Sequence, residues 1–255
     1  MMSFYVVIPA RLASTRLPGK PLADIAGKPM IVRVAEQARL SGADDVIVAT
    51  DHESIVNVCS DFGIRAVLTR EDHVSGTDRI AEVSLKMDWS PSATVVNVQG
   101  DEPLIDPDLV ASTAALVSKD VPMATAAHEL EQPEDIFNPN YVKVVLDRFN
   151  RALYFSRAPI PWYRDGYAKT KRTFPSLFTA LRHVGLYAFR NDFLKKYSSL
   201  SVSPIEQIES LEQLRVLWHG YPIAVHVTGK IPEAGVDTAE DLERVRRFFN
   251  CNKQD

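Results

Sequence analysis

The chain has 255 residues, 45% hydrophobic and 24% charged, a composition typical of a globular protein that buries most of its apolar surface. Its formal net charge of −4 offers no general attraction for nucleic acid or an anionic membrane, so any anion must be bound by a local cluster of cations. Its two cysteines, Cys59 and Cys251, form no disulfide framework, and we expect a cytoplasmic protein. We expect neither a signal peptide nor a transmembrane segment.

The first half of the sequence alternates short apolar segments with amphipathic ones, which predicts alternating strands and helices. We expect strands at residues 5–9, 45–50, 65–68 and 94–98, and helices at residues 30–40, 53–62, 78–87 and 107–117. The nearly all-apolar strands indicate a parallel sheet with helices on both faces. Ligands of such sheets bind at the carboxyl ends of the strands, which makes Arg11, Asp51 and Gln99 candidate site residues.

The second half is less regular. We expect strands at residues 123–128, 142–146, 153–156, 184–189 and 223–227, some of them antiparallel, and helices at residues 203–218 and 238–249. Residues 157–182, rich in proline, arginine and lysine, are expected to leave the core as a lid, an arm or part of a subunit interface. With no repeat or linker in the sequence, we predict a single domain over residues 1–255.

Three cations, Arg11, Arg16 and Lys20, lie within ten positions directly after the first strand. Ser14 and Gly19 lie among them and can present a hydroxyl and a backbone amide to a ligand. Such a loop is suited to bind a polyphosphate, although neither GxxxxGK[ST] nor GxGxxG is present. The alternative is that these cations are solvated surface charges.

Two aspartates are candidate ligands of a hard cation. Asp101 follows a buried strand and Gly100, which permits close approach of a ligand, and Asp237 precedes the last helix. Mg²⁺ takes one or two carboxylates together with phosphate oxygens and water. In the alternative interpretation Asp101 caps the next turn and Asp237 caps the helix, although Thr238 with Asp241 can also provide that cap.

A third candidate is the segment of small polar residues that precedes the helix at residues 78–87. Ser75, Gly76 and Thr77 leave free backbone amides at the helix start, where a nucleotide base or phosphate can bind. The compatible alternative is that Thr77 or Asp78 caps the helix.

The second half of the sequence carries further candidate residues, which are Arg157, His183, Tyr187, Glu209, Glu212 and Gln213. An arginine such as Arg157 can bind a carboxylate with two hydrogen bonds. The spacing of the last three places them on one face of the expected helix, where carboxylates and amides can recognise sugar hydroxyls. Two alternatives stay open: Glu209 can lie on a solvated helix face, and His183 can have a purely structural role. The role of Glu102 is also open.

Taken in order, these motifs resemble the cytidylyltransferases that make CMP-activated 3-deoxy-manno-octulosonate (KDO). The resembling segments are residues 8–22, 49–51, 75–79, 96–103, 138–143, 154–157, 183–187, 212–215 and 235–238. The match runs from about residue 5 to residue 248. The related CMP-sialic acid synthetases carry a Gly-Gly-Ser-Lys type loop, which is absent here.

The resemblance implies a nucleotide-diphospho-sugar transferase fold, which is a Rossmann-like α/β fold. It has a mostly parallel central sheet and, at about residues 140–190, an antiparallel excursion for dimerisation and sugar binding. The implied reaction is the Mg²⁺-dependent transfer of CMP from CTP to KDO with release of pyrophosphate, for lipopolysaccharide biosynthesis. The alternative substrate is the 8-amino analogue of KDO or another acidic sugar.

The resemblance also implies the roles of individual residues. The nucleotide is bound by Arg11, Ser14, Lys20, Ser75, Gly76, Thr77, Arg79 and Gln99. Asp101 and Asp237 hold Mg²⁺ and form the catalytic group together with Arg11 and Lys20. The acidic eight-carbon sugar is bound by Arg157, His183, Tyr187, Glu212 and Gln213. The implied partners are CTP, the sugar and a second copy of the chain, with no nucleic acid and no membrane.

Overall fold

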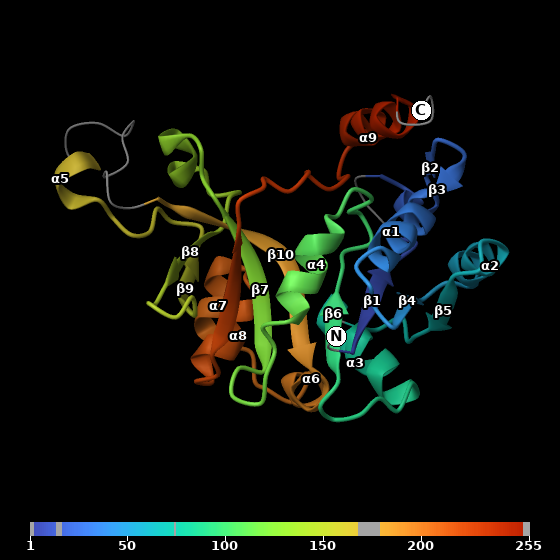
Figure 1. The fold of residues 1–255 in the computed structure, drawn as a ribbon, viewed down its shortest axis with the longest axis horizontal. Helices are drawn as coiled ribbons and strands as arrows, with labels where there is room; N and C mark the ends of the chain where they lie inside the picture. Colours follow the sequence, from blue (N-terminus) through green and yellow to red (C-terminus); the bar gives the residue numbers. More distant parts are fainter. Residues whose placement is uncertain (1–2, 14–16, 74, 168–178, 252–255) are drawn as a thin grey trace.

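The computed structural model describes residues 3–13, 17–73, 75–167 and 179–251. These residues form an α/β structure around a nine-stranded sheet, whose main path has the order β11-β7-β10-β6-β1-β4-β5 (Figure 1). Two further strands, β8 and β9, leave this path, since β8 pairs with β10 and with β9. They lie with α5 at one end of the molecule, and α2 lies at the other end (Figure 1).

The first half builds the parallel part of the sheet, as predicted. Its strands are β1 (Phe4–Ala10), β4 (Asp45–Thr50), β5 (Arg65–Leu68) and β6 (Thr94–Asn97), and each neighbouring pair is parallel. Its helices are α1 (Met30–Arg39), α2 (Glu53–Asp61), α3 (Gly76–Lys86) and α4 (Pro107–Ala114). A short 3₁₀ helix, η1 (Lys20–Leu22), and a hairpin of β2 (Asp24–Ile25) and β3 (Lys28–Pro29) follow the opening loop.

The second half adds the antiparallel part. Its strands are β7 (Met123–Glu129), β8 (Lys143–Leu146), β9 (Ala152–Ser156), β10 (Leu181–Arg190) and β11 (Ile223–Thr228). Strand β10 lies between β6 and β7 and is antiparallel to both, which confirms the expected mixed sheet. The helical segments are η2 (Pro133–Phe137), α5 (Arg164–Tyr167), α6 (Asn191–Tyr197), α7 (Pro204–Glu209), α8 (Gln213–Trp218) and α9 (Ala239–Cys251).

Neighbouring residues of the central strands are buried on opposite faces of the sheet. Val6 and Ile8 of β1 belong to a core with residues of α1, α4 and α9. Val7 belongs to a second core with residues of α3, α6 and α8. Because side chains alternate along a strand, a strand apolar at every position must be covered twice, and the predicted double coverage is confirmed.

The single helix predicted at residues 203–218 is wrong. Helix α7 begins with a capping box between Ser203 and Glu206 and ends at Ser210, which has the left-handed φ of +53°. Helix α8 then returns, so that Arg215 binds the Glu206 carboxylate with Nε and Nη2 at distances from 2.6 to 3.2 Å. This mostly buried, charge-assisted pair favours the break over a continuous helix.

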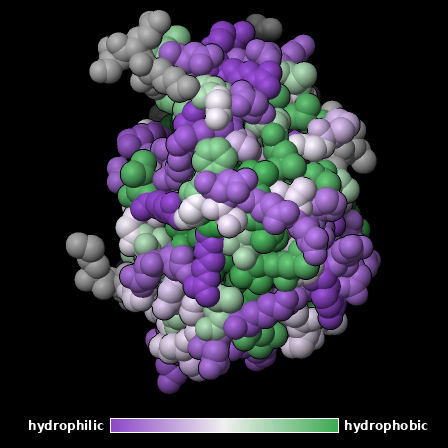
Figure 2. Space-filling view, turned by 90° about the vertical axis from the view of Figure 1, so that its right-hand side faces the viewer, coloured by the Kyte–Doolittle hydropathy of each residue, from purple (hydrophilic) through white to green (hydrophobic). Residues whose placement is uncertain are grey.

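The surface at the β5 end of the sheet intermixes hydrophilic and hydrophobic residues (Figure 2). The edge strand β5 is only four residues long and carries Arg65, which pairs with Asp45 of β4 at 2.8 Å. A short strand with a charged side chain is a poor template for pairing with another chain. Within the described ranges, no helix combines the length and apolar character needed to cross a membrane.

Candidate active site

The carboxyl ends of β1 and β6 open into a pocket of about 320 Å³. The opening loop leaves β1 at Arg11 and returns through Gly19, whose φ of +65° is the left-handed conformation that glycine adopts at little cost. The pocket is lined by Pro9, Ala10, Arg11, Ala13, Lys20, Pro21, Gln99, Gly100, Asp101 and Asp237. Five predicted site residues therefore meet in one place, namely Arg11, Lys20, Gln99, Asp101 and Asp237. Ser14 and Arg16 lie outside the described residues.

Lys20 lies between the two predicted metal ligands. Its Nζ donates to Asp101 Oδ2 at 2.6 Å and to Asp237 Oδ1 at 3.0 Å. The two carboxylates come from distant parts of the sequence, and they would repel each other without a cation between them. The site is therefore built to hold positive charge at the point where the two carboxylates meet.

The start of α9 places Asp237 at this pocket. Asp241 Oδ2 accepts hydrogen bonds from Thr238 N, from Thr238 Oγ1 and from Asp237 N, and Asp241 N donates back to Thr238 Oγ1. The hydrogen bond from Thr238 is the largest factor lowering the pKa of Asp241. The cap formed by Thr238 and Asp241 is confirmed, and the alternative that Asp237 itself caps the helix is wrong.

Glu102 is a buried acid beside this pair of carboxylates. Burial raises the pKa of Glu102 to about 8, and the neighbouring Asp101 adds to the shift. Its Oε2 has no hydrogen-bond partner among the described residues. The segment with Gly235 packs against it, and Val236 N donates to Asp101 O at 2.8 Å. Burial therefore favours the neutral form of Glu102.

Gly100 packs against the protein backbone. A Cβ added at this glycine would lie 2.8 Å from the Pro9 carbonyl oxygen, at the end of β1. The Cβ side of Gly100 is therefore filled by the strand that carries Arg11, while Gly100 also lines the pocket. Close approach of a ligand at Gly100 stays a prediction.

Replacing Gly100 by alanine should push β1 away from β6 at the pocket. We expect a loss of stability of about 1–3 kcal/mol, as for overpacked cores. Thermal unfolding measures this effect. Gly229→Ala is the matched control, since its Cβ meets nothing within 4 Å, and equal behaviour of the two variants would contradict the prediction.

The residues that begin α3 lie against the same pocket wall. Ser75 is the helix cap, since its Oγ accepts from Asp78 N at 3.1 Å and donates to the Asp78 carboxylate at 2.8 Å. The expectation that Thr77 or Asp78 is the cap is therefore wrong. A Cβ added at Gly76 would lie 3.5 Å from Pro9 Cγ, so the loop borders the pocket through Pro9.

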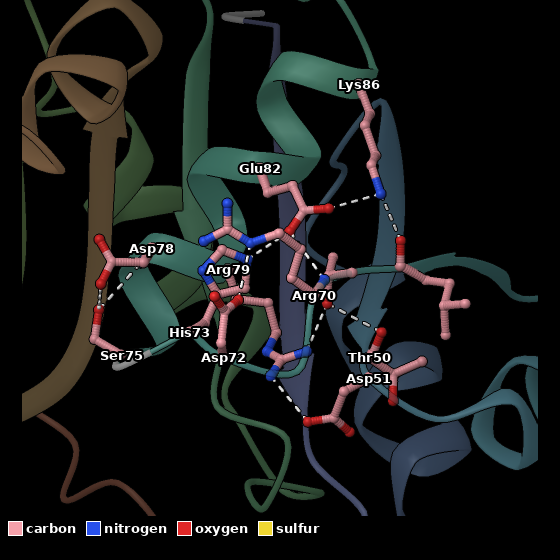
Figure 3. A network of polar contacts seen from close by, with 12 residues as sticks. Thr50, Asp51, Arg70, Asp72, His73, Ser75, Asp78, Arg79, Glu82 and Lys86 are labelled. Carbon is pink, nitrogen blue, oxygen red and sulfur yellow. Dashed lines mark hydrogen bonds and ion pairs between the residues drawn. The ribbon is translucent and has the colours of Figure 1, made fainter.

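Arg79 has a fully buried side chain, with 0% of its surface exposed. Its Nη2 donates to Asp51 at 2.9 Å (Figure 3). Its Nη1 donates to Thr69 Oγ1. Both partners follow neighbouring strands, β4 and β5. In this conformation the guanidinium of Arg79 is fully enclosed and fixes Asp51. The expected contact of Arg79 with a nucleotide stays a prediction.

A neighbouring network was not foreseen from the sequence. Arg11 Nη2 donates to the carbonyl of His73. The His73 ring contacts the Glu82 carboxylate (Figure 3). Glu82 also accepts from Arg70 N and pairs with Lys86. Burial would raise the pKa of Glu82, but the hydrogen bonds from Lys86, His73 and Arg70 outweigh it and lower this pKa to about 2. The network ties Arg11 to α3.

The expected sugar-binding residues of β10 lie at an irregularity in its pairing with β7, between Val184 and Tyr187. His183 Nε2 lies 2.9 Å from Thr125 Oγ1, and Tyr187 Oη donates to Gln213 Oε1 at 3.1 Å. The two rings are 5.4 Å apart. Burial lowers the pKa of His183 to about 3 and raises that of Tyr187, so both side chains are neutral hydrogen-bonding groups.

One contact links the His183 and Tyr187 region of β10 to the pocket at the end of β6. Gln99 Nε2, in the wall of the pocket, donates to the Gly185 carbonyl of β10 at 3.4 Å. The residues after β6 and the irregular part of β10 are therefore neighbours. This arrangement brings the candidate nucleotide-binding residues and the candidate sugar-binding residues close together.

Arg157 and Glu209 form a unit of their own. Arg157 Nε donates to the Glu209 carbonyl at 2.7 Å and Nη1 donates to the Pro139 carbonyl at 3.0 Å. The Glu209 carboxylate accepts from Ser156 Oγ and from Arg157 N, so the alternative of a solvated Glu209 is wrong. Because the chain breaks after Glu209, it shares no helical face with Glu212 and Gln213, contrary to the prediction.

The fold and the pocket define a class, the α/β enzymes that bind a nucleotide polyphosphate at the strand ends and transfer part of it. The family model described as cytidylyltransferase matches residues 5–228. The chain belongs to this cytidylyltransferase family, in the branch of the 3-deoxy-manno-octulosonate cytidylyltransferases, also called CMP-KDO synthetases. This confirms the resemblance found in the sequence.

The relatives match over nearly their whole length. The 3-deoxy-manno-octulosonate cytidylyltransferase of Herminiimonas arsenicoxydans is 65% identical over 248 residues, 97% of this chain and 99% of the relative. The 3-deoxy-manno-octulosonate cytidylyltransferase of Neisseria meningitidis serogroup C (strain 053442) is 60% identical over 250 residues, which are 98% of this chain and 99% of the relative. A solved CMP:2-keto-3-deoxy-manno-octonic acid synthetase in complex with CTP superposes with a TM-score of 0.88 at 42% identity, over 98% and 99% of the two chains. The predicted fold class is thereby confirmed.

Proposed function

We propose that this protein transfers CMP from CTP to KDO, releasing pyrophosphate and supplying CMP-KDO for lipopolysaccharide biosynthesis. The observation that carries the proposal is the pocket in which Arg11 and Lys20 meet Asp101 and Asp237. The 65% identity to a 3-deoxy-manno-octulosonate cytidylyltransferase supports the same activity. The match to a CTP complex supports CTP as the nucleotide.

The chemistry is an in-line displacement at phosphorus. The anomeric hydroxyl at C2 of the sugar attacks the α-phosphorus of CTP, and pyrophosphate leaves on the opposite side. The task of the chain is to position the reactants and to neutralise charge as it develops. Arg11 and Lys20 neutralise the leaving pyrophosphate. Gln99, the cap at Ser75 and the amides of Gly76 and Thr77 hold the nucleotide, and Ser14 belongs to the same proposed loop.

The donor set suits Mg²⁺. Two carboxylates converge on a single cation, Lys20 Nζ, and the described residues contain no group of three or more potential metal ligands. One or two carboxylates, completed by phosphate oxygens and water, are the usual protein site for this ion. Asp101 and Asp237 would hold it, and a bound Mg²⁺ would lower the pKa of the attacking hydroxyl and polarise the phosphate.

The sugar lies between the pocket and β10 in this proposal. Arg157 recognises its carboxylate, and the neutral His183 and Tyr187, together with Glu212 and Gln213, recognise its hydroxyls. Gln213 Nε2 is buried without a hydrogen-bond partner among the described residues, as expected of a donor that awaits a ligand. The 8-amino analogue of KDO and other acidic sugars remain alternative substrates.

The proposal includes a cytoplasmic homodimer built on the second half of the chain. Large apolar side chains are exposed there, among them Ile208 at 83%, Phe149 at 65% and Leu153 at 60%. Contiguous exposed apolar side chains mark protein contacts, and these residues are candidates for such a surface. Part of the expected excursion, residues 168–178, lies outside the described residues.

A substrate panel tests the proposed function. Purified protein is mixed with each of the four NTPs and with KDO, 8-amino-KDO or sialic acid, with and without Mg²⁺, and pyrophosphate release is followed. We expect CTP with KDO and Mg²⁺ to react fastest. Failure of every CTP and sugar pair would contradict the proposal, and light scattering of the same preparation should give twice the mass of the chain.

A further inference from the structure

Lys143 is a fully buried lysine at the start of β8, with 0% of its surface exposed. Its Nζ donates to three backbone carbonyls: to Asn138 at 3.0 Å, to Tyr141 at 2.6 Å and to Arg157 at 2.6 Å. An ammonium group has three N–H donors, so these carbonyls use all of them. The side chain is a fixed link between three points of the backbone.

Burying this charge costs free energy, since the ammonium group gives up its water. Burial lowers the pKa of Lys143 to about 8, the Glu209 carboxylate opposes this shift and the Arg157 guanidinium adds to it. An apolar side chain of similar length would fill the space without this cost. What the lysine provides, and an apolar side chain would not, is that it holds the three carbonyls in position.

These carbonyls determine where Arg157 lies. One belongs to Arg157 itself, directly after β9. The other two flank Pro139, whose carbonyl accepts from Arg157 Nη1. Lys143 thus holds the backbone of Arg157 and the turn that receives its guanidinium, while Glu209 holds the remaining side through Nε and N.

We propose that Lys143 is a positioning residue for the acidic sugar, which it serves by holding Arg157 and the turn at residues 138–141 in the geometry that binds the sugar carboxylate. The proposal rests on the proposed function, in which Arg157 recognises that carboxylate. Because Lys143 has no exposed surface, it touches no substrate and acts through Arg157. The nucleotide pocket contains none of these residues.

The test compares the two substrates in Lys143→Met. We expect the KM for KDO to rise by about 10- to 100-fold, the range for a misplaced binding group, with the KM for CTP within twofold of wild type. Lys143→Gln, which can still donate two N–H bonds, should recover part of the sugar affinity. Lys119→Met, at an exposed lysine, is the matched control and should leave both KM values unchanged.

The outcomes separate this inference from the proposed function. If the wild type makes no pyrophosphate from CTP and KDO, the proposed function fails. If the wild type is active and the KM for KDO in Lys143→Met stays within twofold, the inference on Lys143 is overturned. If both lysine variants lose CTP binding in calorimetry together with sugar binding, Lys143 supports the whole fold, and the inference is overturned as well.

Discussion

Asp101→Asn is expected to lower kcat by about 10²- to 10³-fold, the cost of losing one preorganised electrostatic contact to a transition state. Asparagine keeps the shape of the side chain but removes the charge that attracts Lys20 at 2.6 Å. Asp237→Asn removes the other carboxylate of the pair and should have a similar effect. CTP binding should persist in both variants, because Arg11 and Lys20 remain.

Turnover at saturating Mg²⁺ and CTP titration by calorimetry measure these effects. Asp108→Asn is a matched control, since the Asp108 side chain is 90% exposed on α4 and lines no part of the pocket. Near-normal turnover of both variants would exclude the carboxylate pair from catalysis. Loss of CTP binding with unchanged kcat would assign the pair to nucleotide affinity alone.

Lys20→Met should reduce kcat/KM for CTP by about 10²- to 10³-fold. Methionine retains the length and packing of the side chain but cannot neutralise the leaving pyrophosphate. It also leaves Asp101 and Asp237 without the ammonium that lies between them, so their mutual repulsion is expected to loosen the start of α9.

Pyrophosphate release at a range of CTP concentrations measures the effect of this substitution. Lys28→Met is the control, because Lys28 forms a surface pair with Glu36 and exposed pairs contribute little. A kcat/KM within fivefold of wild type for Lys20→Met would contradict the assignment to the leaving group.

Local patterns predicted the elements, and contacts between distant residues decided where those predictions failed. Strands β4 and β5 have the predicted bounds, because short apolar runs between turn residues carry a local signal. The break at Ser210 depends on the pairing of Arg215 with Glu206, which no helical periodicity reveals. The order of the strands, with β10 inserted between β6 and β7, likewise depends on pairings between distant segments.

The candidate site was predictable where residue type and position after a strand coincide, as at Lys20 and Asp101. The sequence did not reveal that Gly100 packs against the Pro9 carbonyl or that Arg79 binds Asp51, because it does not show which parts of the protein become neighbours. The role of Lys143 was missed because a single lysine in an apolar segment is normally predicted to lie on the exposed side of a strand. Its role is visible only in the structure, where its Nζ is surrounded by the carbonyls of Asn138, Tyr141 and Arg157.

The position of β10 has a consequence for the order in which the newly made chain can acquire its structure. Strands β6 and β7 are complete by Glu129, yet the strand that joins them ends only at Arg190. Until that segment has left the ribosome, the β10-facing edges of β6 and β7 have no native partner. Late closure of a sheet by a distant segment slows folding and exposes strand edges to other chains. Strand β10, which carries the proposed sugar-binding residues His183 and Tyr187, is therefore also the last to join the centre of the sheet.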